Sequence, residues 1–250
     1  MTDRFFCPEI PTTGRAHLDG TEAHHLQRVL RKSVGDQIEI FDGSGRAATA
    51  EITDLSKRSV TLNILQMRET PKPTSQVTLA TAVPKGDRFR WLVEKAVELN
   101  VDCLVPMITE RSVVKPGEGK REKMEQVVVE ACKQSGRNWL MTIEETQNWS
   151  DFLNHWFADH PFDLAFIAHP SGPPMAEVLS MGLRGSVLFL VGPEGGWTET
   201  EVAQACDAGA TAVGLGPNIL RIETAAIALA TLGALHRLQA PPKNTLTESG

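Results

Sequence analysis

The spacing of hydrophobic and polar residues divides the chain into two differently patterned parts. In the first part, short apolar runs cover residues 36–42, 47–53 and 59–67, and the sequence DGSGR at 42–46 marks a turn between the first two. Short strands at this spacing predict a small β-barrel or sandwich. Residues 21–31 carry apolar positions at helical spacing, so one helical segment is expected beside these strands.

Beyond residue 76, apolar runs alternate with segments of helical period. The predicted strands are residues 77–83, 101–107, 163–169, 186–192 and 211–216. The predicted helices are residues 87–99, 123–134 and 224–238. Strands that are apolar on both faces and alternate with helices indicate a parallel sheet covered by helices, so the expected fold class is α/β. Ligands bind beyond the carboxyl ends of such strands, which makes the loops after three of the predicted strands, 163–169, 186–192 and 211–216, the candidate sites.

The two patterns meet at RETPKPTSQ, residues 68–76, where prolines and small polar residues favour a linker. We therefore expect an N-terminal domain over residues 1–72 and a larger domain over residues 73–245. A chain of 250 residues is long enough for two such domains.

The composition excludes several classes of protein. With 41% hydrophobic and 22% charged residues, the chain has the make-up of an ordinary soluble globular protein. The net charge of −6 argues against non-specific binding to nucleic acid but leaves room for a local basic face. We expect no membrane segment, because the most apolar stretch, residues 224–236, is shorter than the ~20 residues that span a bilayer.

Four cysteines, Cys7, Cys103, Cys132 and Cys206, are far apart and form no CxxC pair. This spacing suggests neither a zinc site nor a disulfide framework, so we expect no metal and a reducing, cytoplasmic location. Buried, unreactive thiols are the expectation for all four.

The sequence LVGPEGGWTETEV at 190–202 crowds three glycines between a predicted strand and a predicted helix. Glycine lets the backbone turn sharply and approach a ligand closely. Thr198 and Glu201 match a capping box, which makes Thr198 the predicted N-cap of the helix.

Glu194 lies within this loop and bears on the choice of ligand. A carboxylate opposes a phosphate, since two like charges ~4 Å apart cost about 4 kcal/mol at a surface-like dielectric. No lysine follows the glycines, and neither GxxxxGK[ST] nor GxGxxG is present. The loop therefore favours a nucleoside without phosphate; the alternative is a tight turn with a solvated glutamate and no ligand.

A second loop, residues 214–230, turns at Gly216 and enters the apolar C-terminal helix. Arg221, Glu223 and Thr224 cluster at the mouth of that helix, where an unpaired buried charge is costly. The cluster is either part of a site or an Arg221–Glu223 ion pair that caps the helix.

The sequence HHLQRVLRK at 24–32 supplies a local basic face. Its predicted polar residues are His24, His25, Arg28, Arg31 and Lys32. Its predicted inward residues are Leu26, Val29 and Leu30. An RNA-binding face and an ordinary solvated helix face both fit this pattern.

Several segments in order resemble one family. They are RFF at 4–6, HHLQRVLRKSVGD at 24–36, KGDRFRWLVEKAVELNVDCLVP at 85–106, ERSVVK at 110–115, QSGR at 134–137, VGPEGGWTETE at 191–201 and LGPNILRIETAA at 215–226. The chain closely resembles the RsmE family of the SPOUT (trefoil-knot) methyltransferases, which methylates N3 of a specific uridine in bacterial 16S ribosomal RNA. The resemblance covers nearly the whole chain.

The resemblance implies a C-terminal parallel-sheet SPOUT domain with a deep trefoil knot, preceded by a small PUA-like β-barrel that docks RNA. It implies S-adenosyl-L-methionine as methyl donor, the 16S rRNA of the 30S subunit as partner, and a homodimer formed through the knotted domain. The C-terminal helix is apolar nearly all round, which predicts burial on every side, against a second subunit or within one chain.

The resemblance also implies that main-chain amides of the two glycine loops hold the adenosine. The expected cofactor-binding residues are Leu190, Val191, Gly192, Pro193, Glu194, Gly195, Gly196, Leu215, Gly216, Asn218, Ile219, Leu220 and Thr224. S-Adenosylmethionine has no phosphate, so a carboxylate is tolerable beside it. Glycine would be needed because a side chain would occupy the ligand's place.

Methylation at N3 needs a group that stabilises the deprotonated uracil and a group that accepts its proton. Arg221 is our candidate for the first task, because a guanidinium aimed at developing charge acts by preorganised electrostatics. Glu194 and Glu223 are equal candidates for the second, and His169 is expected to be structural. The candidate RNA-binding residues are Arg4, His24, His25, Arg28, Arg31, Lys32, Arg111 and Arg137.

Two other functions stay open at this point. One is a related knotted methyltransferase that acts on another RNA or another atom, such as a tRNA ribose hydroxyl. The other is a non-catalytic RNA-binding protein.

Overall fold

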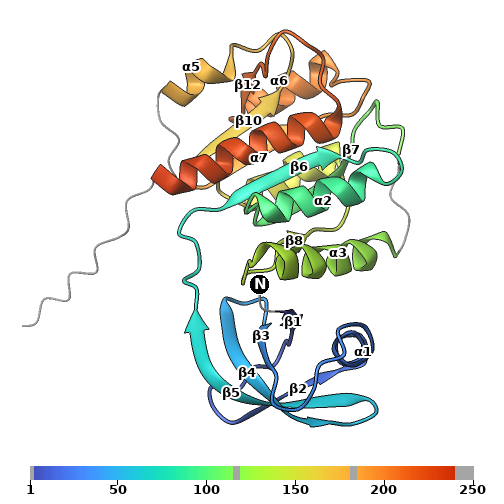
Figure 1. The fold of residues 1–250 in the computed structure, drawn as a ribbon. Coiled ribbons are helices and arrows are strands. Elements are labelled where there is room, and N and C mark those ends of the chain that lie inside the picture. The colour runs from blue at the N-terminus through green and yellow to red at the C-terminus, as the bar shows by residue number, and fades with distance from the viewer. Residues whose placement is uncertain (1–2, 115–118, 181–184, 240–250) are drawn as a thin grey trace, which may run out of the picture. The chain divides into compact units, whose positions relative to one another are not determined.

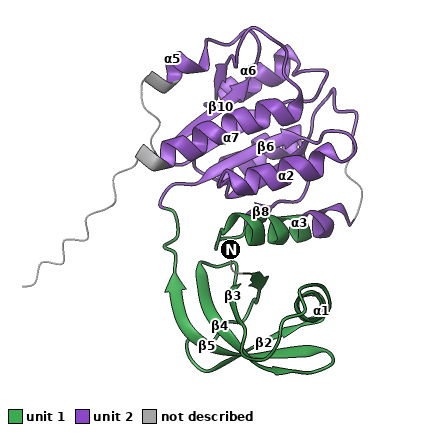
Figure 2. Cartoon of the chain, in the orientation of Figure 1, with its two compact units in different colours: residues 1–73, 125–140 green, residues 74–124, 141–250 purple. Residues whose placement is uncertain are grey.

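The computed structural model describes residues 3–114, 119–180 and 185–239 (Figure 1). The chain forms two compact units, the first of residues 1–73 and 125–140 and the second of residues 74–124 and 141–250 (Figure 2). The first unit's first segment ends at residue 73, one residue after the domain end expected at residue 72. Residues 125–140, which the sequence assigned to the second domain, group with the first unit instead.

A curled sheet of five strands, in the order β1-β3-β4-β5-β2, builds the first unit. Its strands are β1 Arg4–Phe6, β2 Arg15–Asp19, β3 Gln37–Phe41, β4 Arg46–Leu55 and β5 Ser59–Glu69. Two register shifts between β4 and β5, at Thr49/Ala50 and Ile52/Asp54, interrupt the ladder as β-bulges do and increase its twist. The predicted β-rich domain is confirmed, although the short strands β1 and β2 were not predicted.

The helical segment expected over 21–31 is a short helix, α1 (Gly20–His24), followed by a π-helical turn, η1 (His25–Val29). The predicted inward face is wrong in part: Leu26 is buried, but Val29 is 62% exposed and Leu30 is 37% exposed. A π-helical turn takes more residues than the α-helical spacing assumed, so the residues after Leu26 are rotated out of the predicted register.

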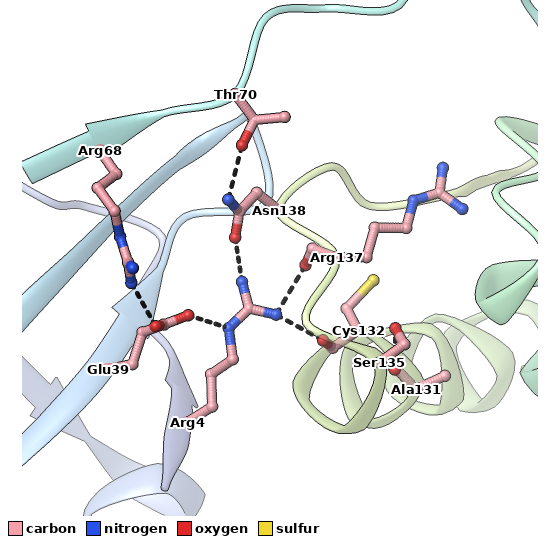
Figure 3. Close-up of polar contacts among 9 residues, drawn as sticks. All are labelled: Arg4, Glu39, Arg68, Thr70, Ala131, Cys132, Ser135, Arg137 and Asn138. Carbon is pink, nitrogen blue, oxygen red and sulfur yellow. Dashed lines mark hydrogen bonds and ion pairs between the residues drawn. The ribbon is translucent and has the colours of Figure 1, made fainter. Parts of the chain in front are cut away.

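Residues 125–140 group with the first unit, and Figure 3 shows part of the contact, in which Arg4 of β1 binds this segment. The Arg4 guanidinium donates to the carbonyl oxygens of Cys132, at 2.6 Å, and Arg137, at 3.0 Å, and to the Asn138 side chain. Its Nε donates to Glu39 Oε1 at 2.8 Å. Charge-assisted hydrogen bonds of this kind are the stronger ones in proteins. Lys133 with Glu22 at 3.0 Å, and Trp139 Nε1 with the Thr70 carbonyl oxygen at 2.9 Å, add to the attachment of this segment.

A parallel sheet builds the second unit, in the order β12-β10-β11-β6-β7-β8, with β9 also paired to β7. Its strands are β6 Val77–Ala82, β7 Cys103–Ile108, β8 Thr142–Ile143, β9 Gln147–Asn148, β10 Leu164–Ala168, β11 Val187–Val191 and β12 Thr211–Val213. Every residue of β6 and β11 is buried, as expected for central strands covered on both faces. The predicted parallel sheet is confirmed.

The helices that follow residue 73 range in length from about one turn to five turns. They are α2 Arg88–Glu98, α3 Lys120–Ser135, α4 Trp149–Asp151, η2 Phe152–Phe157 (π-helical), α5 Met175–Ser180, α6 Glu199–Asp207 and α7 Ile222–Gln239. Helix α2, predicted over 87–99, buries the apolar side chains of Phe89, Leu92, Val93 and Ala96, whereas Leu99, just beyond its end, is half-buried. None of the helices in the described ranges has the length and apolarity that crossing a membrane requires.

Helix α7 returns from the edge strand β12 to pack against β6 and β11 in the middle of the sheet (Figure 1). At Gly233, an added Cβ would lie 2.8 Å from a methyl carbon of Val77, so glycine permits this close approach. The predicted burial of α7 on every side is wrong for the single chain, because Leu235 is 51% exposed. The trefoil knot stays a prediction.

Candidate functional site

A cavity of about 300 Å³ lies beyond the carboxyl ends of β10, β11 and β12, where a parallel sheet is expected to bind its ligand. Its lining residues are Arg111, Ala168, His169, Pro170, Val191, Gly192, Pro193, Glu194, Gly196, Trp197, Leu215, Gly216, Asn218, Ile219, Leu220, Ile222 and Ala225. The two glycine loops and the segment after β10 therefore meet around one space.

Glycines shape the walls of this cavity for two physical reasons. Gly196 and Gly216 adopt φ angles of +70° and +135°, which side-chain-bearing residues rarely adopt. At Gly192, an added Cβ would lie 2.8 Å from the Trp197 ring. We expected a side chain to occupy the ligand's place; at Gly192 it would instead collide with the protein's own tryptophan.

Trp197 anchors the first glycine loop to the sheet. Its ring is buried, and Nε1 donates to the carbonyl oxygen of Ala168, at the end of β10, over 3.2 Å. The ring centroid lies 5.0 Å from that of Trp149, whose own Nε1 donates to Gln204 of α6 at 2.8 Å. The loop is thereby fixed to two neighbouring elements before any ligand binds.

The predicted capping box at the start of α6 is confirmed. The Thr198 side chain accepts from the Glu201 amide, and Glu201 Oε2 accepts from the Thr198 amide at 2.8 Å. Glu201 is 4% exposed, and its Oε1 also accepts from the Glu110 amide at 2.9 Å. This second contact, which joins the loop after β7 to α6, was not visible in the sequence because it joins segments 91 residues apart.

Arg111 was predicted to face RNA, and the structure places it in the cavity wall. Its Nη1 donates to the carbonyl oxygens of Gly195, at 3.1 Å, and Trp197, at 3.3 Å. The guanidinium thus supports the glycine loop by binding its carbonyl groups.

Most of the residues predicted to bind the cofactor line the cavity. Exceptions are Leu190, which is buried within β11, together with Gly195 and Thr224. The sequence missed Ala168, Pro170, Trp197, Ile222 and Ala225 as lining residues. Ala168 and Pro170 lie at the end of the predicted strand 163–169, whose loop was already a candidate site, and Trp197, Ile222 and Ala225 lie in or beside the two glycine loops.

His169 lines the cavity and was expected to be structural. Its Nδ1 accepts from the Ser171 amide over 3.3 Å, and its own amide donates to Val213 O at 2.9 Å. These contacts shape the turn after β10.

The three predicted catalytic residues occupy different positions. Glu194 is exposed at the cavity rim, and Arg221 is exposed between the lining residues Leu220 and Ile222. Glu223 is buried, lies outside the cavity lining, and pairs with Arg88 Nη1 at 3.5 Å. Within the described residues, the alternative Arg221–Glu223 ion pair is not formed, and Glu223 Oε2 has no hydrogen-bond partner.

The residues of the predicted basic face at 24–32 differ in exposure and in their partners. His24 and Arg28 are exposed, whereas His25 is half-buried and lies edge-on to Phe5 at 6.1 Å between ring centroids. Lys32 pairs with Asp3 at 2.6 Å. Arg31 is exposed and has a φ angle of +52°, a left-handed conformation at the end of η1.

Arg4 and Arg137, both predicted to bind RNA, have largely buried side chains. The Arg4 side chain is 6% exposed, its donors are occupied as described above, and its guanidinium lies 4.2 Å from the centroid of the Phe41 ring. Burial lowers the pKa of both guanidiniums, although Glu39 acts to raise that of Arg4. Their role in RNA binding stays a prediction.

The cysteines only partly match the expected burial. Cys7 and Cys132 are buried, and burial raises the pKa of half-buried Cys103 to about 11. Cys206 on α6 is exposed, so the expectation was wrong for this residue. In the parts of the chain that the structure describes, no three His, Cys, Asp or Glu side chains gather as metal ligands would.

Two family models match the chain. An RNA methyltransferase PUA domain matches residues 18–65, and an RNA methyltransferase domain matches residues 70–234. The ribosomal RNA small subunit methyltransferase E of Synechocystis sp. is 33% identical over 232 residues, which cover 91% of this chain and 76% of the relative. The chain belongs to the RsmE family of RNA methyltransferases.

Further relatives have the same name. The Bacillus subtilis ribosomal RNA small subunit methyltransferase E is 32% identical over 229 residues, which cover 87% of each chain. The Neisseria gonorrhoeae family member, solved bound to S-adenosyl methionine, superimposes with a TM-score of 0.83 and 32% identity over 93% of this chain and 96% of that one. The first unit thus has the PUA-like fold and the second the SPOUT fold expected from the sequence.

Proposed function

We propose that this protein transfers a methyl group from S-adenosyl-L-methionine to N3 of a uridine in the 16S rRNA of the small ribosomal subunit. The observation that carries the proposal is the cavity lined by the two glycine loops of an RsmE-family chain. A cytoplasmic location is part of this proposal, because the proposed substrate is a ribosomal subunit.

The cavity fits this methyl donor better than a phosphate-bearing cofactor. Its volume of about 300 Å³ lies at the lower end of small-molecule sites, and most of its lining residues are glycines or have apolar side chains. The one cationic side chain in its lining, Arg111, already binds two loop carbonyl groups, and the nearby Glu194 would repel phosphate. Val191, Leu215 and Leu220 would contact the adenosine, and the loop amides would hold its polar edges.

When bound, the cofactor supplies an electrophilic methyl group on a sulfonium. The chain must then hold the uracil with N3 in line with that methyl, and such positioning is worth several kcal/mol, on the order of 7 or more in favourable cases. Arg221 is exposed beside the cavity and forms no ion pair among the described residues, so its guanidinium is available to the carbonyl oxygens that flank N3. It would stabilise the negative charge that develops there as the proton leaves.

Glu194 is the better candidate for accepting the N3 proton. It is exposed at the cavity rim, whereas Glu223 lies outside the lining and is engaged by Arg88. We therefore assign Glu194 the role of proton acceptor and Glu223 a structural role at the start of α7.

The deciding experiment is tritiated methyl transfer to 30S particles from a strain that lacks the modification, with the methylated nucleotide mapped. Arg221→Ala is expected to lower kcat at least 100-fold, the usual size of a lost charge-stabilising donor, while cofactor affinity stays near that of the wild type. Normal methylation by the variant would remove Arg221 from the mechanism. Methylation at another atom or on another RNA would contradict the proposed substrate.

A homodimer formed through α7 and α2 is part of this proposal. Leu235 of α7 and Trp91 of α2 are 51% and 45% exposed, although the two helices pack together. The carboxylate of Glu223, at the contact of the same helices, has one buried oxygen without a donor among the described residues. Sedimentation should give a dimer for the wild type and a monomer for W91E/L235E, and a wild-type monomer would refute this part.

A further inference from the structure

An open groove of about 450 Å³ lies on the first unit, between the helical segment and the turn that joins β4 to β5. Its lining residues are Asp19, Gly20, His24, Gln27, Arg28, Lys57 and Arg58. His24 and Arg28 come from the segment that the sequence marked as basic. Lys57 and Arg58 come from the hairpin turn, which no sequence pattern marked.

The hairpin turn is held in one conformation by its flanking serines. The Ser56 amide donates to Ser59 O at 3.0 Å, the Ser59 amide donates to Ser56 Oγ at 3.1 Å, and the two hydroxyl oxygens lie 2.8 Å apart. Gln27 Nε2 donates to Ser56 O at 3.0 Å and ties the turn to η1. Lys57 and Arg58 are therefore presented at a fixed tip beside Arg28.

The cations of this groove differ from most others in the first unit. Arg4, Lys32, Arg46, Arg68 and Lys133 each pair with a carboxylate. Arg28, Lys57 and Arg58 are exposed and pair with no carboxylate among residues 3–114, 119–180 and 185–239. With Asp19 as the one acid of the lining and His24 neutral, the groove has a net charge of +2 in a chain whose net charge is −6.

We propose that this groove binds the ribose–phosphate backbone of the rRNA substrate. Arg28, Lys57 and Arg58 would neutralise successive phosphates, and His24 would hydrogen-bond a ribose or phosphate oxygen. Exposed cations that line one groove and pair with no carboxylate among the described residues suit a polyanion, whose binding is driven by the release of counterions. The inference rests on the proposed function for the identity of the RNA.

The test compares K57Q/R58Q with K72Q/K123Q, in which two exposed lysines outside the groove lose the same charge. Affinity for 30S particles is measured at several salt concentrations. We expect K57Q/R58Q to bind at least tenfold more weakly at low salt, with the slope of log K against log salt reduced by about 1 to 2, since each lost phosphate contact removes roughly 0.7 to 0.9. The control should bind as the wild type does, and cofactor affinity should be unchanged in both.

Three outcomes would distinguish a failure of the groove proposal from a failure of the proposed methyltransferase function. Unchanged affinity and salt slope in K57Q/R58Q would overturn the groove. Weakened binding to particles with full binding to protein-free 16S rRNA would mean that the groove contacts a ribosomal protein, which also overturns the proposal. A wild type that binds particles but methylates nothing would contradict the proposed function and leave the binding comparison, and hence the groove, intact.

Discussion

The cavity of the second unit and the groove of the first unit present their chemistry in opposite ways. The cavity is lined mainly by two glycine loops, the first of which is tied to β10 by Trp197, and few of its lining side chains are charged. The groove is formed by cationic side chains from a helical segment and a hairpin turn. A backbone-built site depends on conformation within a short stretch, whereas a side-chain-built site depends on which distant segments the fold brings together.

The difference predicts how each region responds to substitution. Small changes of side-chain volume should damage the cavity severely, because its walls cannot move without moving the sheet ends. The groove should tolerate changes of volume and respond mainly to changes of charge.

The largest expected effect is on the cavity. Gly192→Ala places a Cβ 2.8 Å from the buried, hydrogen-bonded Trp197 ring, so the loop must shift. We expect S-adenosylmethionine affinity, measured by calorimetry, to fall about 100-fold, which corresponds to roughly 2.8 kcal/mol.

Gly195→Ala is the matched control, because the nearest atom to its new Cβ is Cβ of exposed Arg111, at 3.1 Å. It should change the affinity about threefold or less. Equal effects in the two variants would mean that the cavity is less rigid than the contacts of Trp197 imply.

An intermediate effect is expected at Asp42, which closes the turn between β3 and β4. Its carboxylate accepts from Ser44 N at 2.8 Å, Ser44 Oγ at 2.6 Å, Arg46 N at 3.0 Å and Arg46 Nε at 2.8 Å. Asp42→Ala should lower the free energy of unfolding of the first unit by about 2 to 3 kcal/mol, measured in urea, because it leaves these donors unsatisfied. Cofactor affinity should not change.

The same contacts predict a pH dependence. Burial acts to raise the pKa of Asp42, but the hydrogen bonds from Ser44 and Arg46 outweigh it, so the pKa lies below its ordinary value. A depressed folded-state pKa stabilises the protein fully above the unfolded value of about 3.9, and this stabilisation is lost as pH falls through the folded-state pKa. In Asp42→Asn, the free energy of unfolding should therefore fall less steeply as the pH is lowered through this range than it does in the wild type. An identical dependence on pH in the two proteins would contradict a depressed pKa at Asp42.

The smallest expected effect is at Arg31, whose φ angle is +52°. A left-handed conformation costs a side-chain-bearing residue roughly 1 kcal/mol, and glycine adopts it freely. Arg31→Gly should therefore raise the melting temperature by a few degrees at most, and Arg31→Lys should not. Since Arg31 does not line the groove, affinity for 30S particles should change little, and a large loss would return this residue to the RNA-binding surface.

Local sequence patterns predicted the parts of the fold that depend on contiguous residues. The parallel sheet followed from apolar runs such as 186–192, and the start of α6 followed from Thr198 and Glu201. The glycine loops were identified because their conformation is encoded within a few positions, as the φ angles of Gly196 and Gly216 show.

Contacts between distant segments could not be predicted in this way. Arg4 donates to the carbonyl groups of Cys132 and Arg137, and Arg111 donates to those of Gly195 and Trp197, and neither set of contacts is marked by a local sequence pattern. The π-helical turn η1 also broke the assumed α-helical period and exposed Val29. The pattern at 24–32 therefore indicated the basic residues His24 and Arg28 of the groove but not Lys57 and Arg58 of the hairpin turn.

The exposure of Cys206 offers a practical route to watching the methyl-donor loop in solution. Since Cys7 and Cys132 are buried and the Cys103 thiol has a pKa of about 11, a maleimide dye at neutral pH would label Cys206 selectively in the unmodified protein. The dye would sit on the helix that begins directly after the first glycine loop. Its fluorescence could then follow ligand entry in real time, with no engineered cysteine.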